Sequence, residues 1–167
     1  LFSRRFTGPP PSFTRERWAT PDGDYIDVDW LDGTPGSPGT STSPPEGVSP
    51  ALGRPDARLD DTEAKPLLVL FHGLEGSSSS HYAQAFAHWA RDHGWRFAVP
   101  HFRGCSGELN LAPRAYHSGD FEEIGWVLER MRARHTGRIA AVGASLGGNA
   151  LLRWAEEAGE SAARTVS

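Results

Sequence analysis

Residues 143–147 read Gly-Ala-Ser-Leu-Gly and carry the clearest chemical signal of the chain, the pattern Gly-x-Ser-x-Gly. A short apolar run over 138–142 precedes them, and residues 148–155 suit a helix. Between a strand and a helix this pattern is typical of a nucleophile elbow, a strained turn that holds a serine hydroxyl clear of the sheet. It therefore predicts Ser145 as a nucleophile, with an ordinary strand-to-helix turn as the alternative.

The residues around Ser145 have types that suit such a turn. Gly143 and Gly147 would be required because side chains at both positions would collide with neighbouring chain. The N–H of Leu146 would stand at the start of the following helix, pointing at the same spot as the serine hydroxyl. A backbone N–H in that position can stabilise an oxyanion.

A second loop of chemical interest follows an apolar run over 65–71, which is typical of a strand covered on both faces in a parallel sheet. The loop reads His-Gly-Leu-Glu-Gly over 72–76 and continues with four serines. A glycine-rich loop before a helix could cradle a phosphate, but the lysine of a P-loop and the pattern G-x-G-x-x-G are both missing here. We expect instead that the Leu74 N–H serves as a second oxyanion donor.

The remaining elements must bring these loops together. We expect a helix from Ser79 or Ser80 to Gly94, with Tyr82, Phe86, Trp89 and Ala90 on its apolar face, and a strand over 95–100. A second helix is expected from Asp120 to Arg134, with Gly137 at its end. Strands that alternate with helices predict an α/β fold with a mostly parallel sheet, in which sites lie beyond the carboxyl ends of the strands.

Residues 16–30 predict an antiparallel hairpin, with Pro-Asp-Gly-Asp over 21–24 as its turn. In the second arm Asp27 and Asp29 alternate with apolar residues, so we expect them on a wet outer face. The arginines of residues 1–17 are expected to be solvated.

Residues 33–50 are Gly, Pro, Ser or Thr at sixteen of eighteen positions. We interpret about 33–64 as a flexible insertion within a single domain that includes all of 1–167.

Composition excludes several classes of function. The net charge of −4 gives no electrostatic case for nucleic-acid binding. Cys105 is the single cysteine, which rules out an internal disulfide and favours a reducing, cytoplasmic compartment. No apolar run approaches the roughly 20 residues of a membrane span. The seven histidines show no metal-ligand spacing, and we expect neither a metal nor a cofactor.

The chain resembles the α/β-hydrolase superfamily and, within it, the YheT-like esterases. The motifs that carry the resemblance are Phe-His-Gly-Leu-Glu-Gly-Ser over 71–77, Phe-Arg-Gly-Cys-Ser-Gly-Glu over 102–108, Tyr-His-Ser-Gly-Asp over 116–120 and Gly-Ala-Ser-Leu-Gly-Gly-Asn over 143–149. Together with the hairpin they cover most of residues 16–155. His101 stands where the resemblance leads us to expect asparagine.

The resemblance implies a three-layer fold and hydrolysis of small or lipid-like esters with short to medium acyl chains, without a cofactor. It implies Ser145 as nucleophile, the N–H groups of Leu74 and Leu146 as the oxyanion hole, and loop-shaping roles for His72, Gly73 and His117. Arg103 is expected to pin loops through hydrogen bonds to carbonyl groups.

The triad of this fold runs in the order Ser, Asp or Glu, His, but the last histidine of the chain is His135. We therefore expect the acid and base in sequence that follows these residues, and residues 163–167 to open a further strand. This chain would then be the N-terminal part of its domain, inactive by itself. His72 and His117 are the alternatives as base, and Cys105 is a rival nucleophile that lacks the strand-turn-helix frame.

Two classes of function remain open at this stage. The first is a serine esterase, with thioesterase or acyltransferase chemistry possible at the same site. The second is a non-catalytic module in which the turn at Ser145 is only structural. The oligomeric state does not follow from the sequence.

Overall fold

The computed structural model describes residues 9–33 and 65–166 of the chain, so most of the expected insertion at 33–64 lies outside the described residues. The elements, in chain order, are β1 (Phe13–Ala19), β2 (Tyr25–Leu31), β3 (Leu67–Phe71), α1 (His81–Asp92), β4 (Arg96–Pro100), α2 (Phe121–Arg134), β5 (Ile139–Gly143), α3 (Leu146–Ala158), a 3₁₀ turn (Gly159–Ser161) and α4 (Ala162–Thr165).

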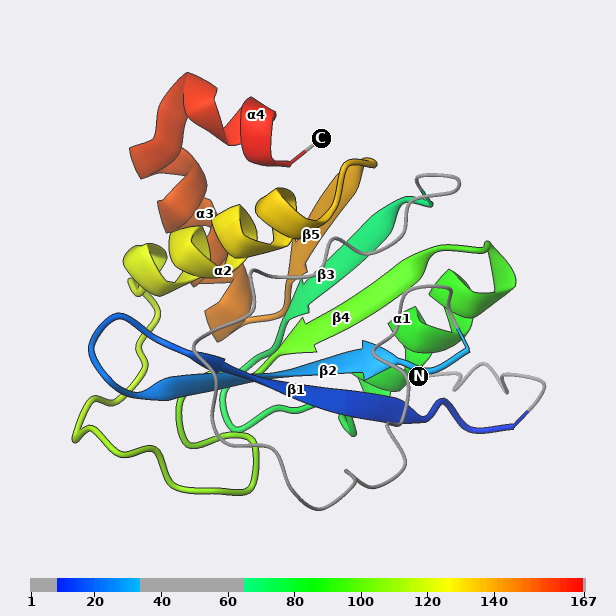
Figure 1. The fold of residues 1–167 in the computed structure, drawn as a ribbon, viewed down its shortest axis with the longest axis horizontal. Helices are drawn as coiled ribbons and strands as arrows, with labels where there is room; N and C mark the ends of the chain where they lie inside the picture. Colours follow the sequence, from blue (N-terminus) through cyan, green and yellow to red (C-terminus); the bar gives the residue numbers. More distant parts are fainter. Residues whose placement is uncertain (1–8, 34–64, 167) are drawn as a thin grey trace, which may run out of the picture.

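The five strands form one mixed sheet in the order β1-β2-β4-β3-β5 (Figure 1). Strands β4, β3 and β5 are parallel to one another, and the β1–β2 hairpin joins them through an antiparallel pairing of β2 with β4. Helix α1 packs on one face of this sheet, and α2 and α3 pack on the other. The expected three-layer α/β architecture with an N-terminal hairpin is confirmed.

Strand β3 shows why its run of apolar residues is continuous. Leu67, Val69 and Phe71 belong to the core beneath α2 and α3, while Leu68 and Leu70 belong to the core beneath α1. Successive side chains of a strand point to opposite faces, so a strand covered on both sides has no polar positions.

The expected apolar face of α1 is confirmed for Tyr82, Phe86 and Ala90 and wrong for Trp89. Its fully buried side chains include Ala83, Ala87 and Ala90, whereas Trp89 is 41% exposed. Small side chains let the helix approach the sheet closely, and Tyr82 and Phe86 pack against the same core from partly buried positions. The apolar spacing thus predicted the helix and most of its buried face, but it missed Ala83 and Ala87.

The expected wet face of β2 is also wrong, because Asp27 and Asp29 are 1% and 3% exposed. Arg17 and Arg15 lie directly opposite them on β1 and bind them through paired hydrogen bonds of 2.7–3.0 Å. A buried carboxylate is tolerated when it is paired and hydrogen-bonded. The two arginines are therefore ion-pair partners and not simply solvated residues.

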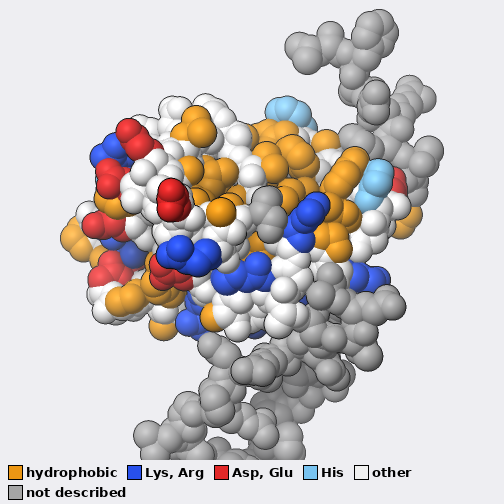
Figure 2. Space-filling model, turned by 90° about the horizontal axis from the view of Figure 1, so that it is seen from above, with side chains coloured by type: hydrophobic (Ala, Val, Ile, Leu, Met, Phe, Trp, Pro, Cys, Tyr) orange, Lys and Arg blue, Asp and Glu red, His pale blue; other side chains and the backbone are white. Residues whose placement is uncertain are grey.

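The C-terminal region differs from expectation as well. Residues Ala162–Thr165 form α4, not a strand, in keeping with the helix propensity of alanine and arginine. The expected bounds of α2 are confirmed, since it covers Phe121–Arg134 with Asp120 at the N-cap position. The Asp120 carboxylate binds Arg114 and makes no capping hydrogen bond, and His135, not Gly137, follows the last helical residue. Among the described residues β5 is paired on one side only, with β3. Hydrophobic side chains gather on the side of the molecule where β5 and α3 lie (Figure 2).

The turn from β5 into α3 is held against the end of β3. A Cβ added at Gly147 would lie 2.4 Å from the carbonyl oxygens of both Phe71 and His72. One added at Gly143 would lie 2.5 Å from the Cα of Gly148. Since real Cβ atoms do not approach other atoms so closely, both glycines are sterically required, as the sequence predicts.

His72 ties two strand-end loops together. Its Nδ1 lies 2.8 Å from the carbonyl oxygen of Gly73, and its Nε2 accepts a hydrogen bond of 3.0 Å from the Phe102 N–H. This pattern fits the neutral ring with its proton on Nδ1. Burial lowers the pKa of His72 from its usual 6.5 to about 4, although the bond to Gly73 opposes the shift.

We predict that replacement of Gly147 by alanine destabilises the protein by about 3 kcal/mol or more, because the contacting atoms are backbone and cannot move aside. Gly119→Ala is the control, since a Cβ there would meet the His117 ring no closer than 3.5 Å. Urea unfolding of both variants measures the difference. Equal stabilities would contradict the steric account.

We also predict that His72 makes the folded state sensitive to mild acid. The unfolded chain protonates His72 more readily than the folded one, so its stabilisation is present above about pH 6.5 and lost as the pH falls toward 4. Between pH 7 and pH 5 the loss should be about 2 kcal/mol. His72→Gln should reduce the difference between unfolding at these two pH values, and His93→Gln, which replaces an exposed histidine, should preserve it. An unchanged difference in His72→Gln would refute this prediction.

Candidate active site

Ser145 stands at the junction of β5 and α3 in a conformation that few side chains adopt. Its φ is 50° and its ψ is −113°, and Glu75 is the other described non-glycine residue with positive φ. Backbone of this kind costs about 1–3 kcal/mol and persists only where the surroundings impose it. The side chain is exposed and does not cap α3.

The position of Ser145 favours an anion close to its hydroxyl. It precedes the first turn of the 13-residue helix α3, whose first N–H groups have no partner within the helix. The Leu146 N–H is the first of these. The partial positive charge at a helix N-terminus adds to the same effect.

The loop over 72–76 lies directly beside Ser145. A Cβ added at Gly73 would be 3.4 Å from the Ser145 Cβ and from the Ala144 carbonyl oxygen. Leu74, the next residue, is 70% exposed. The fold thus brings together the two loops that the sequence singles out.

These two loops follow neighbouring strands whose connections diverge. After β3 the chain crosses to α1 on one face of the sheet, and after β5 it continues into α3 on the other face. Such a point, at the carboxyl ends of parallel strands, is where ligands bind in open α/β sheets.

The two histidines considered as bases are differently placed. His72 is fully buried and both of its ring nitrogens are engaged in the contacts with Gly73 and Phe102. With a pKa of about 4 it is neutral near pH 7. His117 is exposed, and its Nδ1 accepts a hydrogen bond of 3.2 Å from the Gly119 N–H just before α2. Both side chains thus hold local loop structure.

Two tyrosine hydroxyls contact the 72–76 loop, and sequence reasoning assigned them no role. The Gly73 N–H donates to Tyr82 and the Glu75 N–H donates to Tyr116, each at 2.9 Å. Tyr82 could be recognised only as part of a helix face, and Tyr116 only as part of a motif. The two contacts join residues 9 and 41 positions apart, and no local sequence pattern reveals contacts at such separations.

Cys105 is partly buried and does not follow a strand directly. Burial raises the pKa of its thiol, opposed by a hydrogen bond with Tyr116. A thiol with a raised pKa is a poor nucleophile near pH 7. Within residues 9–33 and 65–166, no three His, Cys, Asp or Glu side chains are grouped so as to hold a metal ion.

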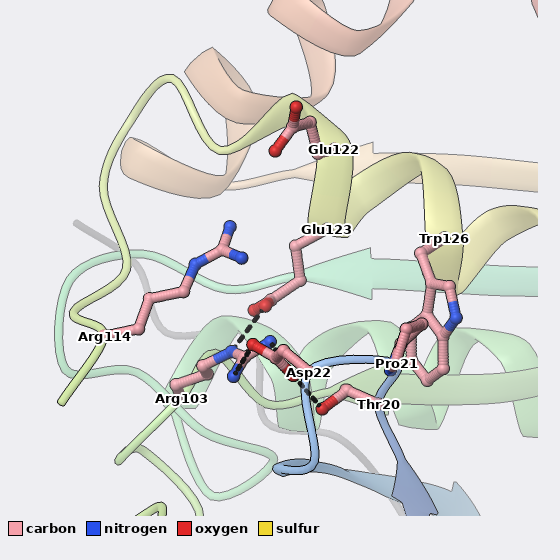
Figure 3. Close-up of a pocket in the computed structure, with 8 residues that line it drawn as sticks. All are labelled: Thr20, Pro21, Asp22, Arg103, Arg114, Glu122, Glu123 and Trp126. Atoms are coloured by element: carbon pink, nitrogen blue, oxygen red, sulfur yellow. Dashed lines mark hydrogen bonds and ion pairs between the residues drawn. The ribbon is translucent and has the colours of Figure 1, made fainter. Parts of the chain in front are cut away.

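A cavity of about 180 Å³ opens between the turn of the hairpin and the start of α2 (Figure 3). Most of its lining residues have polar or charged side chains, but the surface that they present to the cavity is mainly apolar, and Trp126 lies on one side. The lining residues are Thr20, Pro21, Asp22, Arg103, Arg114, Glu122, Glu123 and Trp126. Because Ser145 is not among them, this cavity is not the space in which an ester would meet the serine.

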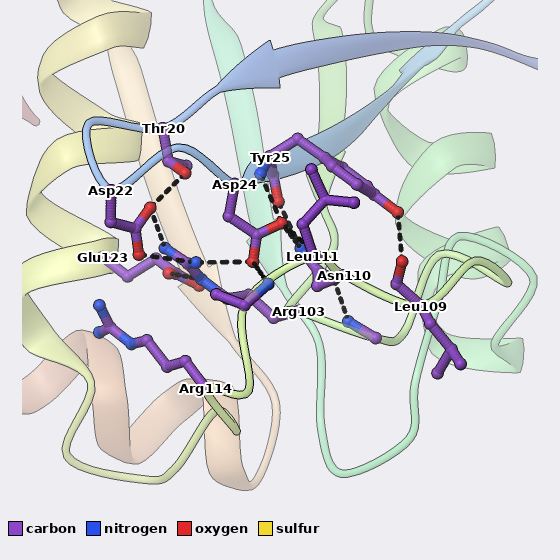
Figure 4. A network of polar contacts seen from close by, with 12 residues as sticks. Thr20, Asp22, Asp24, Tyr25, Arg103, Leu109, Asn110, Leu111, Arg114 and Glu123 are labelled. Carbon is purple, nitrogen blue, oxygen red and sulfur yellow. Dashed lines mark hydrogen bonds and ion pairs between the residues drawn. The ribbon is translucent and has the colours of Figure 1, made fainter.

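Arg103 pins the loops around that cavity, but through carboxylates and not through the expected carbonyl groups. Its guanidinium binds Glu123 at 2.6 Å, Asp24 at 3.0 Å and Asp22 at 2.9 Å (Figure 4). The side chain is 3% exposed, and a buried guanidinium requires such charged partners.

Asp24 extends this network to the loop over 109–112. Burial alone would raise its pKa, but hydrogen bonds from the N–H groups of Leu111, Tyr25 and Ala112 and from the Asn110 side chain hold that pKa well below its usual range. The loop after β4 is therefore fastened to the hairpin.

His101, the departure from the expected asparagine, also has a structural partner. Its Nε2 lies 2.8 Å from Asp29 Oδ2, and that carboxylate accepts a further bond of 2.6 Å from the Ser78 hydroxyl. Burial alone would raise the pKa of Asp29, but the bonds from His101, Arg15 and Ser78 hold it well below its usual range. These contacts link the hairpin to the loops after β3 and β4.

Comparison with solved structures agrees with this fold. The chain is similar to mouse alpha/beta hydrolase domain-containing protein 10, with a TM-score of 0.56 and 16% identity, over 88% of this chain and 46% of that one. It is also similar to the esterase Pf2001 of Pyrococcus furiosus, with a TM-score of 0.54 and 15% identity, over 93% of this chain and 49% of that one. At these identities the likeness concerns the fold alone.

Curated sequences give more specific relatives. The chain is 41% identical over 138 residues to the Escherichia coli protein named "Putative esterase YheT", which covers 81% of this chain and 33% of that protein. It is 28% identical over 147 residues to mouse phospholipase ABHD3, a match that covers 87% of this chain and 31% of that protein. It is 30% identical over 104 residues to yeast monoacylglycerol lipase, a match that covers 61% of this chain and 23% of that protein. The chain spans about a third of the length of the first two of these relatives.

No helix in the described part of the chain is both long and apolar enough to cross a bilayer. The family model described as "alpha/beta hydrolase fold" matches residues 66–167, which include both loops beside Ser145. With the YheT relationship over most of its length, the chain belongs to the α/β-hydrolase family, in the YheT-like branch.

Proposed function

We propose that the protein is a serine hydrolase of carboxylic esters and that Ser145 is its nucleophile. The observation that carries the proposal is the conformation of Ser145, an exposed residue with a φ of 50° before α3 whose hydroxyl is not used for capping. Strain at a non-glycine residue is characteristic of the nucleophile elbow. The steric need for Gly143 and Gly147 adds support.

The reaction would proceed through an acyl-enzyme. The Ser145 oxygen attacks the ester carbonyl carbon while a base takes its proton, and the carbonyl oxygen becomes an oxyanion. The N–H groups of Leu74 and Leu146 bind that oxyanion. The C–O bond to the alcohol then breaks as the alcohol takes up the proton, and water releases the acid from Ser145 in a second, equivalent cycle.

The base and the acid of the triad belong to sequence beyond these residues. No histidine follows Ser145 in the chain, and the fold family places both partners after the serine. The engagement of both nitrogens of His72 further supports this assignment.

Lipid-like esters are the substrate class that we favour. The relatives include a phospholipase and a monoacylglycerol lipase, both of which are named for lipid substrates. The 70% exposed Leu74 would offer an apolar contact to an acyl chain beside the serine. Short to medium acyl length and a cytoplasmic location stay predictions from the sequence.

We predict that a fluorophosphonate probe labels the full-length protein on Ser145, because a nucleophile with an oxyanion hole reacts with a tetrahedral phosphorus centre. Ser145→Ala should abolish labelling and esterase activity, and Ser118→Ala, a change at another exposed serine, should leave both unchanged. Mass spectrometry of the labelled peptide gives the site. Equal labelling of Ser145→Ala would refute Ser145 as the nucleophile, and absence of labelling in the unmodified protein would favour a non-catalytic module.

We also predict that residues 1–167 alone show no turnover of p-nitrophenyl butyrate above their Ser145→Ala variant. Without a base the serine remains a neutral alcohol and a weak nucleophile. Loss of triad members leaves at most roughly 10³–10⁴-fold over water, and only if the site keeps its geometry. Clear serine-dependent turnover by this chain would refute the assignment of the base to other sequence.

A further inference from the structure

Two tyrosine hydroxyls flank the backbone amide to which the proposed function assigns an oxyanion. The Gly73 N–H donates to the Tyr82 hydroxyl and the Glu75 N–H donates to the Tyr116 hydroxyl, each at 2.9 Å. Leu74 lies between them. Two of three consecutive amides are thus fixed by side chains from separate parts of the chain.

Tyr82 is held in place at the start of α1. Its hydroxyl fits against Gly76, where an added Cβ would lie 2.4 Å from the tyrosine oxygen. The Gly76 N–H itself bonds to the Gly73 carbonyl oxygen at 2.9 Å, closing the loop into a tight turn. Gly73 is buried, so its N–H requires an acceptor from the protein, and Tyr82 supplies it.

Tyr116 is held by a separate set of contacts. Its ring stacks on Phe102 with centroids 5.2 Å apart and planes 12° from parallel, and Phe102 lies edge-on to His72 at 5.0 Å. Its hydroxyl also shares a hydrogen bond with the Cys105 thiol. Because the oxygen accepts from the Glu75 N–H, its own proton is free to donate to sulfur.

Glu75 gives the second contact its importance. Its φ is 52°, in a region that disfavours side chains. Such a conformation costs about 1–3 kcal/mol and relaxes when the contacts that impose it are removed. Rotation at Glu75 would turn the peptide groups on either side of it. Because the bond from the Gly76 N–H to the Gly73 carbonyl oxygen closes the turn, this rotation would also shift the peptide group between Gly73 and Leu74.

We propose that Tyr82 and Tyr116 are positioning residues that clamp the 72–76 loop so that the Leu74 N–H faces the oxyanion formed at Ser145. This catalytic role of the two tyrosines rests on the proposed function, in which an oxyanion forms at Ser145. A donor aimed in advance at the developing charge stabilises the transition state without reorganisation during the reaction. The tyrosines contact the loop, not the substrate.

The decisive variant is Tyr116→Phe in the full-length protein, because Glu75, whose N–H it frees, is an exposed residue and the fold should tolerate the loss. Tyr25→Phe is the matched control. Its hydroxyl also bonds to the backbone, donating to the Leu109 carbonyl oxygen 2.9 Å away, but in the loop after β4 and not in the 72–76 loop. Tyr82→Phe is a supporting variant, since it leaves the buried Gly73 N–H without an acceptor.

Four quantities separate positioning from a merely structural role. They are the acylation rate from the p-nitrophenol burst, the affinity for a trifluoromethyl ketone that forms an oxyanion on serine, the melting temperature, and amide hydrogen exchange of the peptide spanning 72–76. Tyr116→Phe should lower both the acylation rate and the affinity for the ketone by about tenfold. This is less than the roughly 10²–10³-fold loss expected when a whole oxyanion donor is removed. It should accelerate exchange while the melting temperature stays unchanged, and Tyr25→Phe should change neither rate nor affinity.

Acylation and exchange in Tyr116→Phe at the rates of the unmodified protein would overturn the clamp while leaving Ser145 as nucleophile. A fall in melting temperature with unchanged acylation would also overturn it, because that is the result of a structural tie alone. Failure of Ser145 to react in the unmodified protein would overturn the proposed function and the catalytic purpose of the clamp. Exchange would then show separately whether the tyrosines hold the loop.

Discussion

The contact between the first turn of α3 and the end of β3 is the constraint on which the site depends. Gly147 approaches the carbonyl oxygens of Phe71 and His72 so closely that no side chain fits. This approach places Ser145 against Gly73 and imposes its positive φ. Stabilisation from the packed sheet and helices must offset the strain at this residue.

Around this contact, buried polar groups fasten the loops that follow the strands. His72 joins the loops after β3 and β4, Asp29 joins the hairpin to both, and Arg103 joins the hairpin to α2. Loops carry function but are the most mobile parts of a fold. Charged and neutral hydrogen bonds from three directions give these loops the rigidity that an oxyanion hole requires.

The sequence was informative where local pattern decides structure and uninformative where distant residues meet. The continuous apolar run of β3 and the glycines around Ser145 predicted the parallel sheet and its tight turn. The alternation of polar and apolar residues in β2 predicted, wrongly, that Asp27 and Asp29 face solvent. No pattern within β2 reveals the arginines that lie opposite them on β1. The contact of Tyr116 with Glu75, 41 residues away, is likewise invisible to spacing.

The most direct measurement of the central claim is the crystal structure of the full-length protein after reaction with a phosphonate ester. The account predicts a covalent bond from Ser145 Oγ to phosphorus and a phosphoryl oxygen within about 2.7–3.1 Å of the N–H groups of both Leu74 and Leu146. An adduct on another residue, or a phosphoryl oxygen directed away from these two amides, would contradict it.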